Sequence, residues 1–520
     1  MKKLFALLLA LCLMGCTAAL AEEPVVITLG RSVSTTAEYM EGDTIDDNFW
    51  TRNYLDTSNI QLVNDWTVAD SEYESKLNLC IASGTIPDVL RLSTKTQVNA
   101  LHEAELIADL TDVYEKYASD TTKAIMSGDG GDALKACEVD GRLYAIPYMN
   151  ATIYDMSLLW LRQDWLDKLG LSMPTTMDEL VKVLYAFTFD DPDGNGENDT
   201  YGLAVTDELF SIAVGVNGLF NGFGAYPAIW HDDGNGNYVY GSTQPAMKQG
   251  LELLAKLYKD GVIDPDFALK DVTKVCENIQ GFKFGAMFGA DYAGYFCGTP
   301  QDKWTIAGAV SATGDEVKYS VSSSIINYWV VSAACEHPEA AVELMNIFCD
   351  CVYGDRRGDS LYGVDGIWLN GTGSGNCCWI RTSTPNSLTI DAIKNVVKSV
   401  DARDPSFLKD AVTETDKYEP AVKWLDDGDT AEYARYYQYE AFKINAAEVG
   451  KDCSRLVQNK FVDSTPTMDE VWTILKDYEL EMFTKIIMGN LTIDAFDEFV
   501  TNWNSMGGQA VTEEINAILK

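Results

Sequence analysis

Apolar and polar residues alternate along this chain in blocks that predict strands followed by amphipathic helices. The run 24–33, PVVITLGRSV, is apolar and β-branched and predicts a buried strand, followed by a polar loop that carries aromatic residues through Trp50. Residues 73–84, YESKLNLCIASG, have apolar residues four apart and end at a glycine, as a helix does. The strand-like segment 86–92, IPDVLRL, follows directly. This order of strand, helix and strand is typical of a parallel sheet.

The same helical pattern recurs in the second half. Residues 175–187, TTMDELVKVLYAF, begin with Thr176 and Glu179 at capping-box spacing and keep their apolar residues on one face. Residues 245–261 repeat the pattern, and helical patterns such as 492–508 dominate the C-terminal third. We expect an α/β protein with a helix-rich C-terminal part.

Length and charge narrow the class of protein. With 520 residues, of which 47% are hydrophobic, the chain exceeds what one core normally holds and predicts at least two lobes. The 39 basic residues face 79 acidic ones, giving a formal net charge of −40. This balance excludes a nucleic-acid-binding role, because binding phosphates requires dense lysine and arginine. It also disfavours a strongly anionic ligand.

The N-terminus predicts export. Two lysines precede an apolar run, 4–14, which has the length of a signal peptide within residues 1–21 and is too short to span a bilayer. The run ends in Leu-Met-Gly before Cys16, which resembles the bacterial lipobox and predicts lipidation of Cys16 and an extracytoplasmic, membrane-anchored protein. The alternative is plain secretion after cleavage at the A-x-A-like site 19–21.

Ten cysteines remain after the signal peptide, an even number that would suggest disulfides in an exported protein. Several of them, such as Cys80 and Cys349, stand in apolar contexts where free cysteine behaves as a small buried hydrophobe. We therefore do not expect a full disulfide framework, and the disulfide pattern stays open. Zinc is disfavoured because the tightly spaced cysteines lack histidine companions.

Six ordered stretches give the chain a family resemblance. They are ESKLNLCIASGTIPDVL (74–90), DGRLYAIP (140–147), LLWLRQDWLDKLGLSMPTTMDEL (158–180), DPDGNGENDTYGL (191–203), LAKLYKDGVIDPDF (254–267) and KIIMGNLTIDAFDEFVTNWNSMGG (485–508). Together they resemble the extracellular solute-binding proteins, family 1, of ABC importers, particularly the long-chain branch with lipoproteins of the LipO kind and alginate-binding proteins.

The resemblance implies a type II binding-protein fold, in which two α/β lobes close on a ligand in the cleft between them. We expect lobe one at 24–150 plus 320–400 and lobe two at 151–319 plus 401–520. The implied partners are the permease subunits of an ABC importer, and we expect a monomer that is not an enzyme.

A calcium loop is the sharpest local motif. Oxygen-bearing residues stand at alternate positions with Gly196 at the sixth, and these residues are Asp191, Asp193, Asn195, Glu197 and Asp199. Position 12 is Gly202 instead of a glutamate, and Thr200 occupies the place where alginate-binding relatives have an extra acid. We expect structural calcium here, with a solvated acidic turn as the alternative. The second acidic run, 232–237, predicts a hairpin turn.

A sugar site needs aromatic faces and hydrogen-bonding groups, and 12 Trp and 26 Tyr supply the aromatic faces. Ligands in open α/β folds lie beyond the carboxyl ends of strands, which favours residues on the loops after strand-like runs. The candidates from this rule are Trp50, Tyr148, Asn150, Asp291 and Tyr292, with Trp329 either in the cleft or in the core. The family resemblance adds Asp365 and Trp368, which lie in a glycine-rich stretch where relatives commonly place a ring-stacking aromatic residue. By contrast Trp160, Trp165 and Trp503 lie on predicted helical faces and should be packing residues.

The function predicted from the sequence is capture of a carbohydrate, expected to be an oligosaccharide, and its delivery to an importer. A peptide or another polar solute is the alternative ligand. A secreted glycosidase is the main rival, since carboxylates are abundant, although only three histidines and no G-x-S-x-G, H-E-x-x-H or P-loop motif are present. An adhesive surface protein would fit the tether and the acidity but not the pattern of strands and helices.

Overall fold

The computed structural model of the chain describes residues 23–34, 39, 41–294, 298–299, 301, 303–358, 378–409, 412–450 and 452–520. A five-stranded sheet of order β2-β1-β3-β14-β6 forms the centre of the first lobe. β1 (Val25–Val33) is parallel to β2 (Ile60–Ala69) and β3 (Val89–Leu92). β14 (Ile325–Val331) runs antiparallel to β3 and to β6 (Ile146–Met149). The predicted parallel arrangement therefore holds for the first three strands only.

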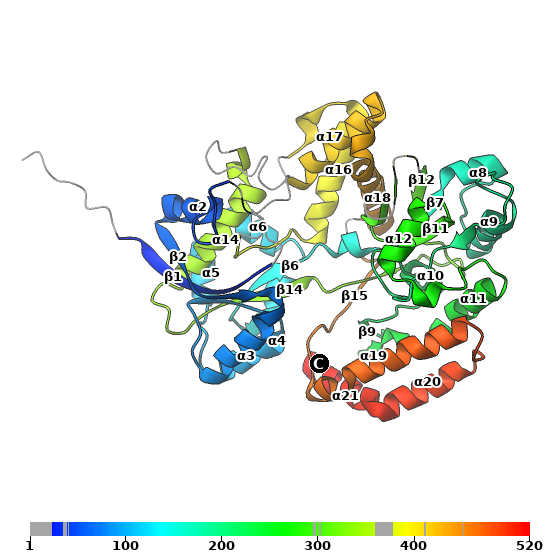
Figure 1. Ribbon diagram of the computed structural model, residues 1–520. Coiled ribbons are helices and arrows are strands. Elements are labelled where there is room, and N and C mark those ends of the chain that lie inside the picture. Colours follow the sequence, from blue (N-terminus) through cyan, green and yellow to red (C-terminus); the bar gives the residue numbers. More distant parts are fainter. Residues whose placement is uncertain are drawn as a thin grey trace, which may run out of the picture.

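Helices lie on both sides of this sheet, with α2, α6 and α14 above it and α3 and α4 below it in Figure 1. The bounds are α2 (Phe49–Ser58), α3 (Tyr73–Ser83), α4 (Lys95–Glu103), α5 (Thr111–Tyr117), α6 (Asp120–Met126), α7 (Asp132–Ala136) and α14 (Glu339–Val352), and the small hairpin β4 (Glu138–Val139) and β5 (Arg142–Leu143) completes the lobe.

The second lobe contains a four-stranded mixed sheet of order β12-β7-β11-β8. β7 (Leu158–Arg162) pairs antiparallel with β12 (Trp304–Ala307) and β11 (Phe284–Gly289), and β11 pairs in parallel with β8 (Tyr201–Leu203). Trp160 lies on β7 and not on a helix, yet it is fully buried, as are Trp165 and Trp503, so all three are packing residues.

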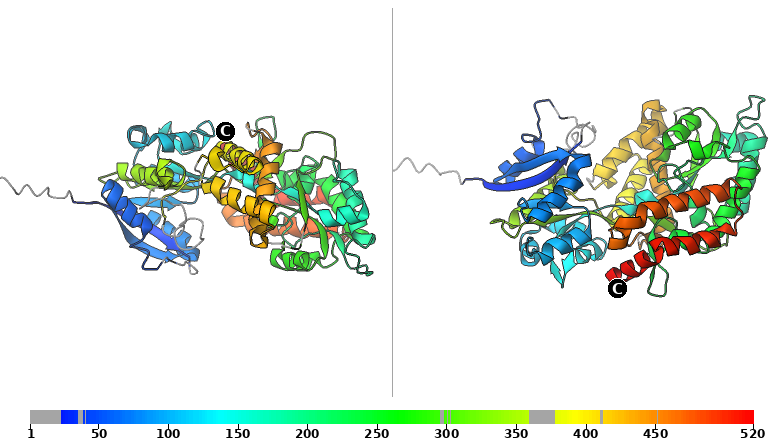
Figure 2. Two further views of the ribbon diagram at one scale, coloured as in Figure 1. Left: turned by 90° about the horizontal axis from the view of Figure 1, so that it is seen from above. Right: turned by 60° about the horizontal axis from the view of Figure 1, so that its bottom comes forward.

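Helices cover the second lobe and form most of the C-terminal third, where α19, α20 and α21 pack beside one another (Figures 1 and 2). Their bounds are α8 (Gln163–Leu169), α9 (Met177–Phe189), α10 (Asn217–Asn221), α11 (Met247–Lys259), α12 (Val272–Gln280), α16 (Asn386–Ala402), α17 (Val412–Asp427), α18 (Tyr433–Val449), α19 (Pro466–Ile487), α20 (Ala495–Trp503) and α21 (Gln509–Leu519). Thr176 caps α9 by accepting from the backbone N–H of Glu179, whereas the Glu179 side chain accepts from Thr175. The predicted helix start is confirmed with this shift of one residue.

Two separate hydrophobic cores correspond to the two lobes. One core draws its residues from 27–149 and 325–380, and the other from 151–321 and 390–515. Ile390 and Ile393 of α16 belong to the second core, so we place the last crossing near residue 385 and not at the expected residue 400. The chain thus passes between the lobes around residues 150, 323 and 385.

Short strands join the second lobe to the crossing region. β13 (Tyr319–Val321) pairs in parallel with β15 (Leu456–Gln458), and β9 (Trp230–Asp232) and β10 (Tyr238–Tyr240) form the antiparallel hairpin predicted around 232–237. Beyond β15, the Asp463 carboxylate accepts a hydrogen bond from the backbone N–H of Thr96 at the start of α4, at 2.7 Å. Both lobes therefore meet again at this point.

Cysteine chemistry is mixed. Cys276 is disulfide-bonded, whereas Cys80, Cys137, Cys335, Cys349 and Cys378 are free thiols. Burial raises the pKa of Cys349 and Cys378 to about 12, so these thiols are unreactive at neutral pH. The chain therefore contains both buried free cysteines and a disulfide-bonded cysteine, as expected for a protein without a full disulfide framework.

Candidate solute-binding site

A series of hydrogen-bonded polar side chains connects the crossing segments near residues 150 and 323 at the junction of the lobes. Asn150 follows β6, and its Nδ2 donates to Ser322 Oγ at 3.3 Å. Ser322 lies on the crossing between β13 and β14, and its hydroxyl donates to the carboxylate of Asp155. Because a hydroxyl can accept one hydrogen bond while donating another, this series of hydrogen bonds fixes the orientation of the Asn150 amide.

Asp291 continues this polar region on the second lobe. It follows β11, is only 2% exposed, and its Oδ2 accepts from Gln438 Nε2 of α18 at 3.1 Å. Its Oδ1 is buried without a hydrogen-bond partner among the described residues. Burial, opposed in part by Gln438 and Lys417, raises the pKa of Asp291 to about 7, and the pKa of the neighbouring Asp155 is also raised by burial.

Three residues expected at the ligand site, Asn150, Asp291 and Tyr292, thus come together at the lobe junction. Burial, together with the charges of Asp155 and Asp291, raises the pKa of Tyr292 to about 12, so both carboxyl groups influence its phenol. Asp155 and Ser322 were not predicted, since no local pattern signals a partner that is 167 residues away in the chain.

Arginine and aromatic side chains gather at the carboxyl ends of the strands of the first lobe. Leu29 of β1 pairs with Val89 of β3, which puts Arg31 and Arg91 at equivalent positions. Their guanidinium groups lie over the Trp379 ring at 5.1 and 4.6 Å from its centroid. The sequence had not pointed to these three residues, because strand positions that meet across a sheet are not adjacent in the chain.

Tyr148 of β6 extends this cluster. It is half-buried and stacks on Trp329 at 6.4 Å between ring centroids, and the Arg381 guanidinium lies 5.5 Å from its ring. Trp329 itself is 1% exposed, and its indole N–H donates to the carbonyl of Arg381 at 3.0 Å. Of the two sequence-based alternatives for Trp329, the core position is the one observed. Tyr148 remains a candidate ligand contact.

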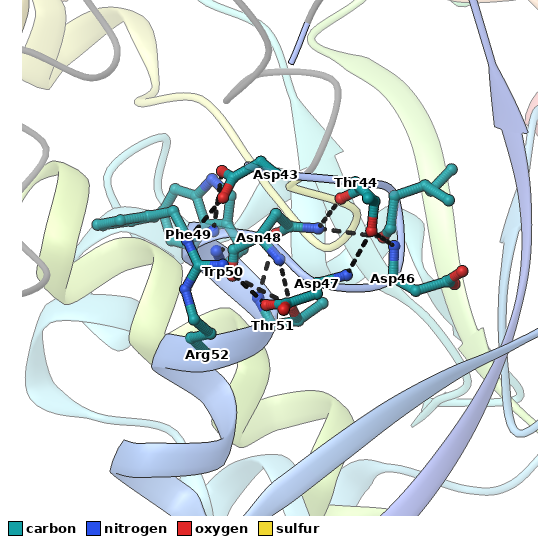
Figure 3. A network of polar contacts seen from close by, with 10 residues as sticks. Asp43, Thr44, Asp46, Asp47, Asn48, Phe49, Trp50, Thr51 and Arg52 are labelled. Carbon is teal, nitrogen blue, oxygen red and sulfur yellow. Dashed lines mark hydrogen bonds and ion pairs between the residues drawn. The ribbon is translucent and has the colours of Figure 1, made fainter. Parts of the chain in front are cut away.

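Trp50 does not occupy the loop in which it was expected. It is the second residue of α2, and Asn48 caps this helix by accepting from the backbone N–H groups of Trp50 and Thr51 (Figure 3). The Trp50 side chain is fully buried and lies 5.8 Å from Phe348 between ring centroids. It therefore has no surface for a ligand, and the prediction is corrected to a core residue. Asp365 and Trp368 lie outside the described residues.

One pocket is lined by both lobes and by the crossing segments. This interlobe pocket has a volume of about 540 Å³. Its lining residues are Gly128, Asp129, Asp132, Met149, Asn150, His231, Asp232, Ser324, Pro385, Asn386, Ser387, Asp452, Cys453, Leu456, Val457, Gln458 and Lys460. Amide, hydroxyl and carboxylate groups suit a solute rich in hydroxyl groups, and the position between the lobes suits a protein that closes on its ligand.

The acidic loop 191–199 is held by hydrogen bonds among its own side chains. Asn195 Nδ2 donates to Asp193 Oδ2 at 2.8 Å and to Asp199 Oδ1 at 3.2 Å, so both carboxylates face one amide group. Lys283 pairs with the second oxygen of Asp199 and, with Asn195, lowers its pKa. Within the described part of the chain, however, no group of three acidic, histidine or cysteine side chains has the arrangement of a metal site.

The membrane anchor predicted at Cys16 lies outside the described residues, as does the signal peptide. Among the residues that are described, none of the helices combines the length and the apolar character that crossing a bilayer demands.

The fold and the interlobe pocket define a class of two-lobed proteins that hold a solute between α/β lobes. The family model of bacterial extracellular solute-binding proteins matches residues 57–348, more than half of the chain. The chain belongs to this family.

Curated relatives agree with this membership. The fructooligosaccharide ABC transporter substrate-binding protein FusA of Streptococcus pneumoniae is 30% identical over 248 residues, 44% of each chain. The polygalacturonan/rhamnogalacturonan-binding protein YtcQ of Bacillus subtilis is 23% identical over 474 residues, 89% of this chain and 86% of YtcQ. Lipoprotein LipO of Bacillus subtilis is 32% identical over 231 residues, 42% of each chain. The match thus spans less than half the length of FusA and of LipO.

Solved structures share the two-lobed fold. The HMO-binding, ABC-transporter-associated solute-binding protein of Bifidobacterium longum infantis has a TM-score of 0.64 at 17% identity, covering 95% of this chain and 98% of that one. FusA of Streptococcus pneumoniae in complex with kestose has a TM-score of 0.60 at 17% identity, with the same coverage. The α/β two-lobe prediction is confirmed.

Proposed function

We propose that this chain is the extracytoplasmic substrate-binding component of an ABC importer, which captures an oligosaccharide between its lobes and delivers it to the membrane permease. The interlobe pocket carries this proposal, because a solute bound there contacts both lobes and favours their closed arrangement. The names of FusA, a fructooligosaccharide transporter protein, and of YtcQ, a polygalacturonan/rhamnogalacturonan-binding protein, support a carbohydrate as the solute.

Ligand-dependent stabilisation tests this function. The full chain would be heated with kestose, maltotriose, galactotriose, trigalacturonate or a tripeptide, and a bound solute should raise the melting temperature. A shift with the tripeptide alone would replace carbohydrate by peptide as the solute. Chromatography of the recovered saccharide distinguishes a glycosidase, which would shorten it, from a binding protein, which returns it intact.

We also propose that the loop 191–199 holds a structural calcium ion. The spacing of Asp191, Asp193, Asn195, Glu197 and Asp199 supports it, and FusA has also been solved as an EF-hand mutant, so that relative carries an EF-hand. When bound, calcium would crosslink this loop outside the interlobe pocket. Calcium should raise the melting temperature of the wild type, Asp193→Asn should abolish the rise, and Asp233→Asn in the second acidic turn should retain it. An identical response in both variants contradicts the assignment.

The lipid anchor at Cys16 completes the proposed role, since a tethered binding protein stays beside its permease. Expressed with its signal sequence, the wild type should fractionate with membranes, and Cys16→Ala should appear in the medium. Release of the wild type into the medium would favour cleavage at 19–21 instead. Light scattering of the purified protein should give the mass of one chain.

A further inference from the structure

The interlobe pocket carries an excess of negative charge on both of its walls. Asp129 and Asp132 come from the first lobe, and Asp232 and Asp452 come from the second. Lys460 is the one lysine or arginine among the described residues that line the pocket. The formal balance is four negative charges against one positive, with neutral histidine.

Hydrogen bonds hold these carboxylates in place. Asp129 accepts from the backbone N–H groups of Gly131 and Ala133 at 2.9 and 3.0 Å. Asp232 accepts from the N–H of Gly234 at 2.6 Å, and Asp452 accepts from the N–H of Ser454 at 3.3 Å. Asp129, Asp232 and Asp452 are thereby anchored to the turns that carry them, so their charges stay at the pocket wall.

Carboxyl groups also lie behind the pocket wall. Asn150 lines the pocket, and its amide is linked through Ser322 to the carboxylate of Asp155. Asp291 lies close enough to Asp155 for the two carboxyl groups to influence each other. Lys417 shares this region and lowers the pKa of Asp291, so the repulsion of an anionic solute is assigned to the four carboxylates of the pocket walls.

The arginines of the first lobe do not offset this charge within the pocket. Arg31 and Arg91 lie over the Trp379 ring, and Arg381 lies over the ring of Tyr148. None of these residues is among those that line the interlobe pocket. Positive charge is therefore concentrated at the aromatic cluster, away from the pocket walls.

We propose that the interlobe pocket selects an uncharged, hydroxyl-rich saccharide and rejects saccharides that carry carboxylate groups. This inference rests on the proposed function and narrows its solute class. Hydroxyl groups can donate to the pocket carboxylates and to the Asn150 carbonyl oxygen, whereas a uronate places a like charge beside Asp129 and Asp452. Like charges repel each other across these solvent-exposed walls, and added salt screens the repulsion.

A matched pair of probes tests the selection. Galactotriose and trigalacturonate differ only at the sixth carbon of each sugar, and kestose and maltotriose serve as further neutral probes. At low ionic strength trigalacturonate should bind at least about tenfold more weakly than the best neutral probe, and high salt should narrow this ratio. Calorimetric titration of the full chain gives both affinities.

Charge-neutralising variants show whether the pocket carboxylates cause the difference. Asp129→Asn/Asp452→Asn keeps an acceptor oxygen at each position, and it should reduce the discrimination to within about threefold. The control Glu470→Gln/Asp477→Asn removes the same charge from exposed positions on α19 and should leave the discrimination unchanged.

The outcomes separate this inference from the proposed function. Tighter binding of trigalacturonate than of every neutral probe overturns the selection while leaving a saccharide-binding protein. Equal discrimination in the two double variants also overturns it, because the pocket charges would then not be the cause. Binding of none of the saccharides rejects the proposed function and this inference together.

Discussion

Replacing Asp291 by asparagine should change how the stability of this protein depends on pH. Burial raises the pKa of Asp291 to about 7 from an ordinary value of 3.8. Between these values the folded protein holds a proton that the unfolded chain has released, so wild-type stability falls as the pH rises from about 4 to about 7. An asparagine side chain cannot ionise, and the variant loses this contribution to the pH dependence.

The size of the effect follows from the shift in pKa. Each pKa unit corresponds to about 1.4 kcal/mol. Between about pH 4 and pH 7, the free energy of unfolding of the variant should therefore rise relative to that of the wild type by up to roughly 4 kcal/mol. Gln438 can still donate to the asparagine oxygen. The amide group that replaces Oδ1 adds a desolvation cost of about 1–3 kcal/mol, which does not vary with pH.

Urea denaturation of wild type and variant at a series of pH values measures the difference. The difference should grow from about pH 4 to pH 7 and then stay constant. Asp155→Asn should move the wild-type transition to lower pH, because it removes a negative charge that raises the pKa of Asp291. Exposed Asp477→Asn serves as the control. Parallel pH profiles for wild type and Asp291→Asn would refute the reasoning.

Three other substitutions have distinct expected outcomes. Burial raises the pKa of Glu479 to about 7, so the stability of Glu479→Gln relative to the wild type should increase as the pH rises to about 7. A difference in unfolding free energy that does not change with pH would contradict this. Trp50→Ala should cost roughly 3–5 kcal/mol in urea denaturation, whereas a loss below about 1 kcal/mol would contradict its core position. Asn150→Ala should weaken saccharide binding at least about fivefold in calorimetry, because Asn150 lines the interlobe pocket, and unchanged affinity would remove Asn150 from the site.

Local patterns predicted the elements whose signals lie within a few residues of each other. The strand 24–33, the helix after Tyr73 and the cap at Thr176 follow from periodicity and capping chemistry, and each is observed. The alternation in IQLVNDWTVA (60–69) would also have predicted β2, whose side chains alternate in burial. The start of α2 was missed because its capping pair is Asn48 and Thr51, without the glutamate or glutamine of the usual signature.

The site depends on contacts that the sequence does not display. Arg31, Arg91 and Trp379 meet because parallel strands end at one edge, and Trp379 comes to them from a distant segment. Asp155 gains its role from Ser322, which lies 167 residues further along the chain. Gly30 allows another such contact, since a Cβ there would lie 2.2 Å from the Trp66 ring. These pairings are set by tertiary packing, which local periodicity does not encode.

Calorimetric titration of the full chain with kestose, maltotriose and galactotriose, followed by chromatography of the recovered saccharide, tests the proposed capture role most directly. We predict saturable binding of at least one of these saccharides, one molecule per chain, with the saccharide recovered intact. Recovery of shorter saccharides, or binding of a tripeptide but of no saccharide, would contradict the proposal.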